Sequence, residues 1–297
     1  MRMNHLKLAA CLLFVAPLAV EAEEEPTITV SAELRARCLK VLRAGMKSQE
    51  FWPSIHAAEG LALAGQGDEV REFLGPKLVT EKDDQRRCGI IRELVRAGDC
   101  EKGPLMIEIL AKDDTHGHVH AAESSFKVWV KGDGKLLRAA TKSDNVKLEL
   151  MAAAALARHG DKRAFKKLRK RLKDSDPEVN RIASWILARI GDDTDVPQIR
   201  KNVAASKDEL TRAYHQHALA ALRDKEGIAA LIKNLSSKDA AVRTYAATFA
   251  GDARALGAKS ELVRLLDDEN IDVRVRSAQS LLVLSKPTAS PVCMKKK

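Results

Sequence analysis

The chain is poor in aromatic residues, which make up 4% of its 297 residues. Motifs of common catalytic sites are also missing: no glycine-rich phosphate loop, no Gly-x-Ser-x-Gly elbow and no supporting Cys and His arrangement occurs. The five cysteines show no spacing typical of a zinc site. These absences argue against phosphate-loop and serine-hydrolase chemistry, and they favour binding over catalysis.

Long hydrophobic runs are missing after the first 22 residues. Residues 1–22 combine a basic start, an apolar run of about a dozen residues and the small residue Ala22, as in a secretory signal peptide too short to span a membrane. We expect cleavage after Ala22 and export to a bacterial periplasm. Lipoprotein anchoring through Cys11 is the alternative, and it is disfavoured because almost no apolar segment precedes Cys11.

Export would place the remaining cysteines, Cys38, Cys88, Cys100 and Cys293, in an oxidising compartment. A bridge from Cys88 to Cys100 is awkward, because twelve helical residues span about 18 Å. A bridge from Cys38 to Cys88 on neighbouring helices is geometrically easier. The alternative is that Cys38 and Cys88 are small buried hydrophobes.

The sequence repeats about every 31 residues, with a Gly-Asp or similar break after each alanine-rich stretch. The breaks lie at 67–68, 98–99, 132–133, 160–161, 191–192, 223–224 and 251–252. A period of this length predicts a solenoid, in which each unit buries its apolar face against its neighbours. Because strong helix formers dominate, the expected class is all-α.

The breaks predict about eight antiparallel helix pairs over residues 31–286. Ser31 is expected to cap the first helix and Gly45 to end it. The second, alanine-rich helices are expected at 53–65, 84–97, 118–131, 145–159, 176–190, 208–222, 239–251 and 270–284. Residues 23–30 are predicted to be an unstructured lead, and residues 287–297 a flexible basic tail.

The segment from Asp176 to Ala183, followed by Leu187 to Asp192, resembles the HEAT repeat in its shorter form, known from phycobilisome lyases. Segments beginning at Asp239 and Asp272 resemble it again, and the resemblance covers about residues 50–285. It implies a right-handed superhelix whose second helices line the concave side. The family includes scaffolds, transport factors and a few enzymes, so it specifies the fold and not the function.

The resemblance also implies a ladder of Asp and Arg residues between repeats. One set of arginines recurs at intervals of 31 residues: Arg181, Arg212, Arg243 and Arg274. We expect them to pair structurally with Asp176, Asp208, Asp239 and Asp272. The alternative is that they face an acidic partner in the concave groove.

A His-Ala-Ala-Glu motif occurs twice, at His56 to Glu59 and at His120 to Glu123. Histidine and glutamate at i and i+3 share a helix face and could bind a metal. The pattern resembles deoxyhypusine hydroxylase, a HEAT-like enzyme with a di-iron centre. However, the ligand positions of that family fall on residues such as Ile55 and Val119, and no His-Glu dipeptide occurs.

Stacking at about 10 Å per helix would separate the two motifs by about 20 Å, which disfavours one shared metal. A separate hypothesis places a metal site at His116, His118 and His120. The alternative is that these histidines cap a helix or are simply exposed at the surface. His215 and His217 point apart on a helix, which argues against joint metal binding.

The segment 162–173 carries eight cationic residues in twelve. Without residues 1–22 the net charge of +10 becomes +9, because Arg2, Lys7 and Glu21 are removed. This helix could bind an acidic polysaccharide or an anionic membrane surface, or it could be an ordinary solvated face. The candidate residues are Lys166, Lys167, Arg169, Lys170 and Arg171. No nucleic-acid partner is expected for an exported protein.

The preferred hypothesis is a noncatalytic scaffold that binds another protein along its concave face, without a cofactor. Histidine and tryptophan concentrate between about residues 50 and 132, so a specific site is expected there. The aromatic residues could be anchors of that site or could seal the exposed end of the solenoid. The candidate residues are Trp52, His56, Glu59, His120, Glu123 and Trp129. Binding of a polyanion by segment 162–173 is second, and a metal-dependent enzyme is third.

Overall fold

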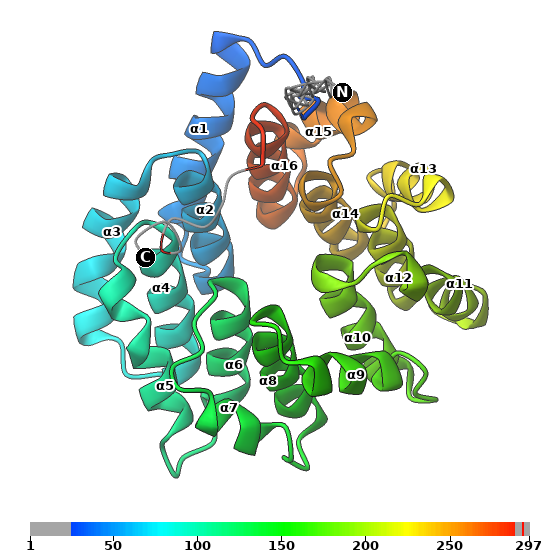
Figure 1. The fold of residues 1–297 in the computed structure, drawn as a ribbon. Helices are drawn as coiled ribbons and strands as arrows, with labels where there is room; N and C mark the ends of the chain where they lie inside the picture. Colours follow the sequence, from blue (N-terminus) through cyan, green and yellow to red (C-terminus); the bar gives the residue numbers. More distant parts are fainter. Residues whose placement is uncertain (1–24, 289–292, 294–297) are drawn as a thin grey trace, which may run out of the picture.

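A computed structural model describes residues 25–288 and residue 293. Over this range sixteen α-helices form eight pairs, and no strand is present (Figure 1). The predicted class, an all-α solenoid of eight helix pairs, is confirmed. The predicted signal peptide, residues 1–22, lies outside the described residues. Among the helices that are described, none combines the length and apolarity needed to cross a membrane.

The second helix of each pair forms an inner layer. These inner helices are α2 (Phe51–Leu63), α4 (Asp84–Arg96), α6 (His118–Lys127), α8 (Val146–Arg158), α10 (Pro177–Ile190), α12 (Glu209–Ala221), α14 (Ala240–Asp252) and α16 (Ile271–Leu284). The outer helices are α1 (Ala32–Met46), α3 (Gly67–Thr80), α5 (Pro104–Leu110), α7 (Lys135–Ala140), α9 (Lys162–Arg171), α11 (Val196–Ala205), α13 (Lys225–Asn234) and α15 (Lys259–Arg264). Short 3-10 turns precede α5, α11 and α15 and follow α15.

Local sequence determines where most inner helices begin and end. An Asp or Asn side chain accepts a hydrogen bond from the first turn of six of them, and the caps are Asp83, Asn145, Asp176, Asp208, Asp239 and Asn270. A left-handed residue then follows the end of an inner helix by two positions, as at Gly65 and Gly160. Arg223 adopts the same conformation without being glycine, at the place where the series of breaks has Arg223-Asp224 instead of Gly-Asp.

The array closes on itself, which the sequence did not predict. Each inner helix packs against the next, and α16 then packs against α1 and α2, so that the eight pairs form a ring (Figure 1). Ion pairs join the two ends: Arg37 contacts Asp267 at 2.6 Å and Arg276 contacts Glu59 at 2.8 Å. We call the contact of α16 with α1 and α2 the seam.

Two glycines allow the helices of the seam to approach closely. A Cβ atom on Gly45 would lie 2.6 Å from Val275 of α16, and one on Gly60 would lie 2.7 Å from Leu42 and 3.3 Å from Gln279. Gly45 is therefore a packing residue inside α1, and the prediction that it ends the helix is wrong. The helix continues to Met46.

The chain ends reinforce the seam. The described part of the predicted lead, residues 25–30, forms no helix, but a hydrogen bond fixes it to the end of α16. The backbone N–H of Ile28 donates to Leu284 O at 3.0 Å. Near the start of the predicted tail, Thr288 N donates to the Glu25 carboxylate at 2.7 Å. Residues 289–292 and 294–297 of that tail lie outside the described residues.

A disulfide joins Cys100 to Cys293, 193 residues apart in the sequence. The sequence analysis did not consider this pair, because only ring closure brings the C-terminal segment beside the end of α4. Cys38 and Cys88 are buried and free, so the bridge between them does not form and their alternative role as buried hydrophobes is confirmed. Burial raises the pKa of Cys38 to about 11 and that of Cys88 to about 12.

Candidate functional site

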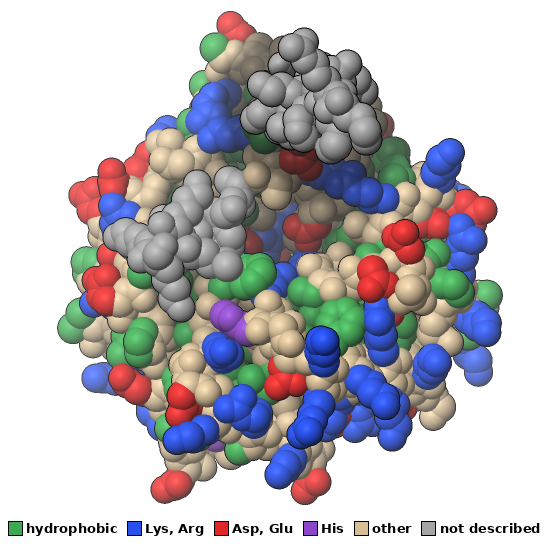
Figure 2. Space-filling view, viewed as in Figure 1, with side chains coloured by type: hydrophobic (Ala, Val, Ile, Leu, Met, Phe, Trp, Pro, Cys, Tyr) green, Lys and Arg blue, Asp and Glu red, His purple; other side chains and the backbone are tan. Residues whose placement is uncertain are grey.

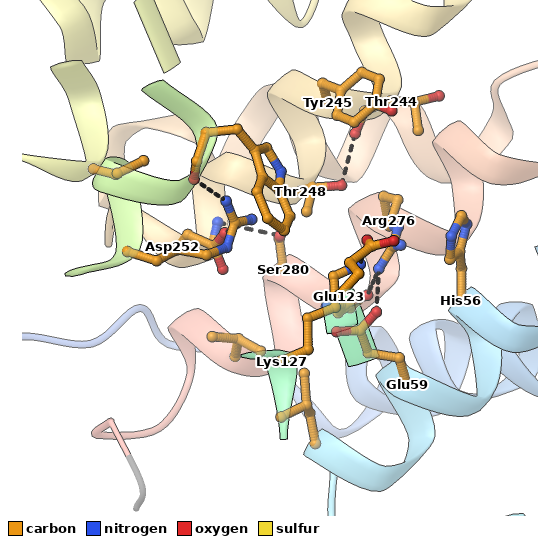
Figure 3. A pocket seen from close by; sticks show the side chains of 18 of the residues that line it. His56, Glu59, Glu123, Lys127, Thr244, Tyr245, Thr248, Asp252, Arg276 and Ser280 are labelled. Atoms are coloured by element: carbon orange, nitrogen blue, oxygen red, sulfur yellow. Dashed lines mark hydrogen bonds and ion pairs between the residues drawn. The ribbon is translucent and has the colours of Figure 1, made fainter. Parts of the chain in front are cut away.

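Closure of the ring turns the concave face into a central cavity of about 1290 Å³. All eight inner helices contribute to its wall, and none of the outer helices does. Figure 2 shows the hollow near the middle of one face of the molecule, and Figure 3 shows side chains that converge on it. The cavity is larger than the roughly 300–1,000 Å³ usual for sites that bind drug-sized ligands.

One side of the wall is built around Glu59 of α2. Its carboxylate contacts Arg96 of α4 at 3.2 Å and Arg276 of α16 at 2.8 Å. Burial alone would raise the pKa of Glu59, but these two guanidinium groups outweigh it and hold the pKa well below its usual value. Glu59 is therefore ionised, and it links α2 to both of its neighbours in the ring.

The second His-Ala-Ala-Glu motif faces the same region (Figure 3). Glu123 contacts Lys127 at 2.7 Å, and its pKa falls to about 2, because Lys127 and Arg92 outweigh the effect of burial. His120 lies 3.8 Å from Glu123 and stacks on Trp52 of α2, with ring centroids 5.1 Å apart. Burial lowers the pKa of His120, so its ring is held neutral between an aromatic and a carboxylate.

His56 of the first motif pairs across the seam. Its Nδ1 atom lies 2.8 Å from the carboxylate of Asp272 on α16. Burial, and then the nearby Arg276, lower the pKa of His56 and outweigh Asp272, which alone would raise it. The neutral ring therefore donates its N–H to Asp272, and the contact holds the ring closed.

The opposite side of the wall is basic and aromatic. Arg189 of α10 contacts Asp252 at 2.6 Å and lies over the Trp185 ring, 4.2 Å from its centroid. Tyr214 and Tyr245 pack with centroids 4.4 Å apart on α12 and α14. Burial, followed by Tyr245, raises the pKa of Tyr214, which keeps its hydroxyl protonated. On this side, Arg181 alone was among the candidate residues from the sequence, where its alternative role was to face a partner in the concave groove.

Four of the six predicted partner-binding residues line the cavity: His56, Glu59, His120 and Glu123. The two tryptophans are in packing positions instead. Trp52 covers His120, as described above, and Trp129 lies in the left-handed conformation after α6 with the Arg158 guanidinium 5.0 Å from its centroid. The predicted site is thus part of a larger one, because closure adds helices from the C-terminal half.

The predicted pairing of arginines with aspartates is wrong. Asp176, Asp208 and Asp239 cap helices, and Asp272 pairs with His56. Three of the arginines instead donate to backbone carbonyls five and six residues earlier, and they are Arg212, Arg243 and Arg274. Each stands four residues after its helix cap, where its side chain can reach back over the turn.

Arg181 departs from this pattern because it stands five residues after its cap, Asp176. Asn180 occupies the fourth position and donates to the Asp174 carbonyl at 3.1 Å. Arg181 therefore turns into the cavity, over the ring of Tyr214 at 5.2 Å. An interval of 31 residues alone could not detect this shift of one position.

The basic helix α9 is less free than its composition predicts. Lys167 and Arg171 contact Glu149 at 3.1 and 2.5 Å, and Arg169 contacts Asp192 and Asp195 at 2.7 and 2.8 Å. Of the five residues proposed to bind polyanions, Lys166 and Lys170 are exposed, and the other three are partly buried. Three cations are neutralised by this chain's own carboxylates, which weakens the polyanion hypothesis.

The three candidate metal-binding histidines have separate partners. His116 contacts Asp83 at 3.1 Å, and His118 lies 3.0 Å from the Lys112 carbonyl, while His120 stacks on Trp52. Across residues 25–288 and residue 293, no group of three His, Cys, Asp or Glu residues could hold a metal ion. His215 and His217 are buried in the wall of the ring.

The fold and the cavity define this chain as a ring-shaped solenoid of helical repeats. Residues 134–220, less than a third of the chain, match the family model of HEAT repeats, so the prediction of HEAT-like repeats is confirmed over these residues. No curated protein matches the chain.

Similar solved structures include three described as engineered proteins from a structural genomics consortium. They are 19%, 18% and 20% identical, with TM-scores of 0.35, 0.34 and 0.27. The matches cover 84%, 83% and 83% of this chain and 78%, 96% and 98% of those chains. TM-scores this low do not establish a shared global arrangement.

Proposed function

We propose that this protein is a noncatalytic binding protein that holds an extended segment of another protein in its central cavity. A solenoid of HEAT repeats suggests a scaffold or protein-binding role, and such scaffolds are usually noncatalytic. The observation that carries the proposal is the cavity itself, to which every inner helix contributes a charged or an aromatic side chain. Aromatic and arginine side chains are the types that dominate binding energy at protein interfaces.

Ring closure limits what the partner can be. An open solenoid can wrap its concave groove around a folded domain, but here the groove is enclosed because α16 packs on α2. An extended segment can enter a cavity of about 1290 Å³, whereas a folded domain cannot. The partner therefore inserts a chain end or a loop.

Export to an oxidising compartment is the second part of the proposal. The disulfide between Cys100 and Cys293 supports it, because structural disulfides persist outside the cytosol. The sequence of residues 1–22 supports it independently.

A cavity-filling variant tests the proposal. Thr248 of α14 points into the cavity (Figure 3), so Thr248→Trp should block it, whereas Thr80→Trp on the exposed end of α3 is a matched control. Affinity capture from an extracytoplasmic extract of the source organism should recover one stoichiometric protein with the wild type and with Thr80→Trp. Thr248→Trp should lose it. Retention of the same partner by Thr248→Trp would place the interface outside the cavity.

A further inference from the structure

Four cations recur along the inner helices at intervals of 31 residues. They are Arg96, Lys127, Arg158 and Arg189, and all four line the cavity. Each lies at or near the C-terminal end of its helix, on α4, α6, α8 and α10 in turn. We call this set the cation ladder. A second set of arginines, which we call the Arg181 series, has the same period and consists of Arg181, Arg212, Arg243 and Arg274. Most of its members donate to backbone carbonyls of the preceding turn, whereas the cation ladder faces the ring interior.

Three members of the cation ladder already have carboxylate partners. Arg96 contacts Glu59, Lys127 contacts Glu123 and Arg189 contacts Asp252, as described above. Arg158 is different: none of the ion pairs within the described part of the chain includes it. Its one hydrogen bond there is from Nη1 to the Phe126 carbonyl at 2.8 Å, and its buried Nε atom has no partner.

The surroundings of Arg158 are mainly apolar and cationic, and the nearby carboxylate of Asp252, which pairs with Arg189, offsets only part of their effect on the pKa of Arg158. Its guanidinium lies 4.0 Å from the centroid of Phe126 and 5.0 Å from that of Trp129. Burial, and then the charge of Arg189, lower the pKa of Arg158 to about 10. Burial of a cation without a counter-charge is unfavourable, and an anion brought beside it would relieve that cost.

The cavity as a whole also carries more positive than negative charge. Nine lysine and arginine residues line it, against four carboxylates. Cavities lined by one sign of charge concentrate ligands of the opposite sign. Guanidinium groups also match the planar geometry of carboxylates, with which they form paired hydrogen bonds.

We infer that the cavity binds an acidic peptide segment and that Arg158, the member of the cation ladder that forms no ion pair among the described residues, takes one of its carboxylates. This inference rests on the proposed function, that a partner segment enters the cavity. Neighbouring inner helices are about 8–10 Å apart, and residues i and i+3 of a peptide in the polyproline II conformation share one face and are separated by about 9 Å. Acidic residues at every third position of such a segment therefore match the spacing of the ladder.

The same cations also have a structural role, which the test must separate from binding. Positive charges near helix C-termini stabilise the helix dipole, and Arg158 packs on Phe126. A purely structural Arg158 would affect thermal stability and leave ligand affinity unchanged. A binding Arg158 affects affinity in a protein that remains folded.

The test measures binding of fluorescein-labelled decaglutamate to the disulfide-bonded mature protein by fluorescence anisotropy at low salt. Wild type should bind it and should not bind decaglutamine. Arg158→Met should weaken binding by about tenfold or more, and Arg158→Lys should weaken it less, because the charge remains. Arg163→Met on the exposed face of α9 is the matched control and should bind as wild type does.

A second pair of variants keeps the inference testable if Arg158→Met does not fold. Thr248→Glu adds a carboxylate to the cavity, and Thr248→Gln adds a neutral side chain of similar size. The glutamate variant should lose about tenfold in affinity for decaglutamate relative to the glutamine variant. Equal affinities of these two variants, or of Arg158→Met and Arg163→Met, would overturn the inference.

An acidic oligosaccharide, oligogalacturonate, is measured in parallel. Binding of this oligosaccharide without binding of decaglutamate would also overturn the inference. If a partner is captured through the cavity, as judged by Thr248→Trp, but decaglutamate does not bind, the proposed function stands and only the acidic character of the segment is wrong.

Discussion

Two interfaces between inner helices differ in how they are held. Between α10 and α12, residues 31 positions apart meet, and Ser184 contacts buried His215 at 2.8 Å. Between α16 and α2, partners more than 200 positions apart meet, His56 in a hydrogen bond with Asp272 and Glu59 in an ion pair with Arg276. The first interface follows from the repeat, whereas the seam depends on charges and glycines that the repeat does not supply. The residues that close the ring are therefore different from those that stack one repeat on the next.

Loss of the disulfide should have the largest effect on stability, and it should weaken the seam more than the α10–α12 interface. Cys100→Ser with Cys293→Ser releases a crosslink across 193 residues, which should lower the free energy of unfolding by about 4 kcal/mol. Chemical denaturation under non-reducing conditions measures the loss, and a reducing agent should affect the wild type alone. Hydrogen exchange should increase more in α2 and α16 than in α10 and α12. A uniform increase along the ring would mean that the seam is no weaker than the repeats.

Acid should next destabilise the α10–α12 side of the ring. Burial lowers the pKa of His215 from 6.5 to about 4 and that of His217 from 6.5 to about 3. Because the unfolded chain then binds more protons than the folded chain, the free energy of unfolding decreases as the pH falls from 6.5 towards 4. The shift at His215 alone corresponds to about 3 kcal/mol once its protonation is complete.

Variants assign this acid sensitivity to one interface or the other. Denaturation curves across this pH range should show a smaller acid loss for His215→Gln than for wild type, since His215 contacts Ser184 of α10. His56→Gln at the seam should change the acid loss less, since Asp272 partly offsets the effect of burial on His56. His116→Gln on an exposed loop is the control. If His56→Gln removes more acid sensitivity than His215→Gln, the seam is the acid-labile interface.

A pair of glycine substitutions should show the smallest effect. A Cβ atom on Gly45 meets Val275 across the seam, so Gly45→Ala should lower the free energy of unfolding by about 2 kcal/mol through overpacking. Gly75 in α3 has nothing within 4 Å, so Gly75→Ala should raise it by about 0.5–1 kcal/mol. Thermal denaturation shows whether each substitution lowers or raises the stability. A stabilising Gly45→Ala would show that the seam tolerates a wider separation.

Much of the fold was predictable from local signals. Asp83 and Asp208 cap inner helices beginning at 84 and 209, close to the predicted 84 and 208, because a cap is a short-range feature. The outer helix α7 carried a weaker local signal, since it has six residues and begins directly after the glycine-containing turn at 132–134. His56, Glu59, His120 and Glu123 were found because a repeated motif marks them.

The other residues of the cavity carried a weaker signal. The cation ladder has the same period as the Arg181 series, and the sequence offers no way to tell which series faces inward. The deciding factor is the position relative to the helix cap, where a shift of one residue rotates a side chain by about 100°. Tyr214 and Tyr245 are also 31 residues apart, but the sequence does not show that their rings meet until α12 and α14 are placed beside each other.

The sequence by itself determined the helices, their caps, their pairing and the period of the stack, because these depend on contacts between residues close along the chain or one repeat apart. Only the tertiary structure decided that the stack closes. Each helix pair is rotated slightly relative to the pair before it. Over eight pairs these rotations add up and bring Gly45, His56 and Glu59 against α16. Such contacts between distant residues leave no periodic trace, yet they convert an open groove into a cavity and set what can bind there.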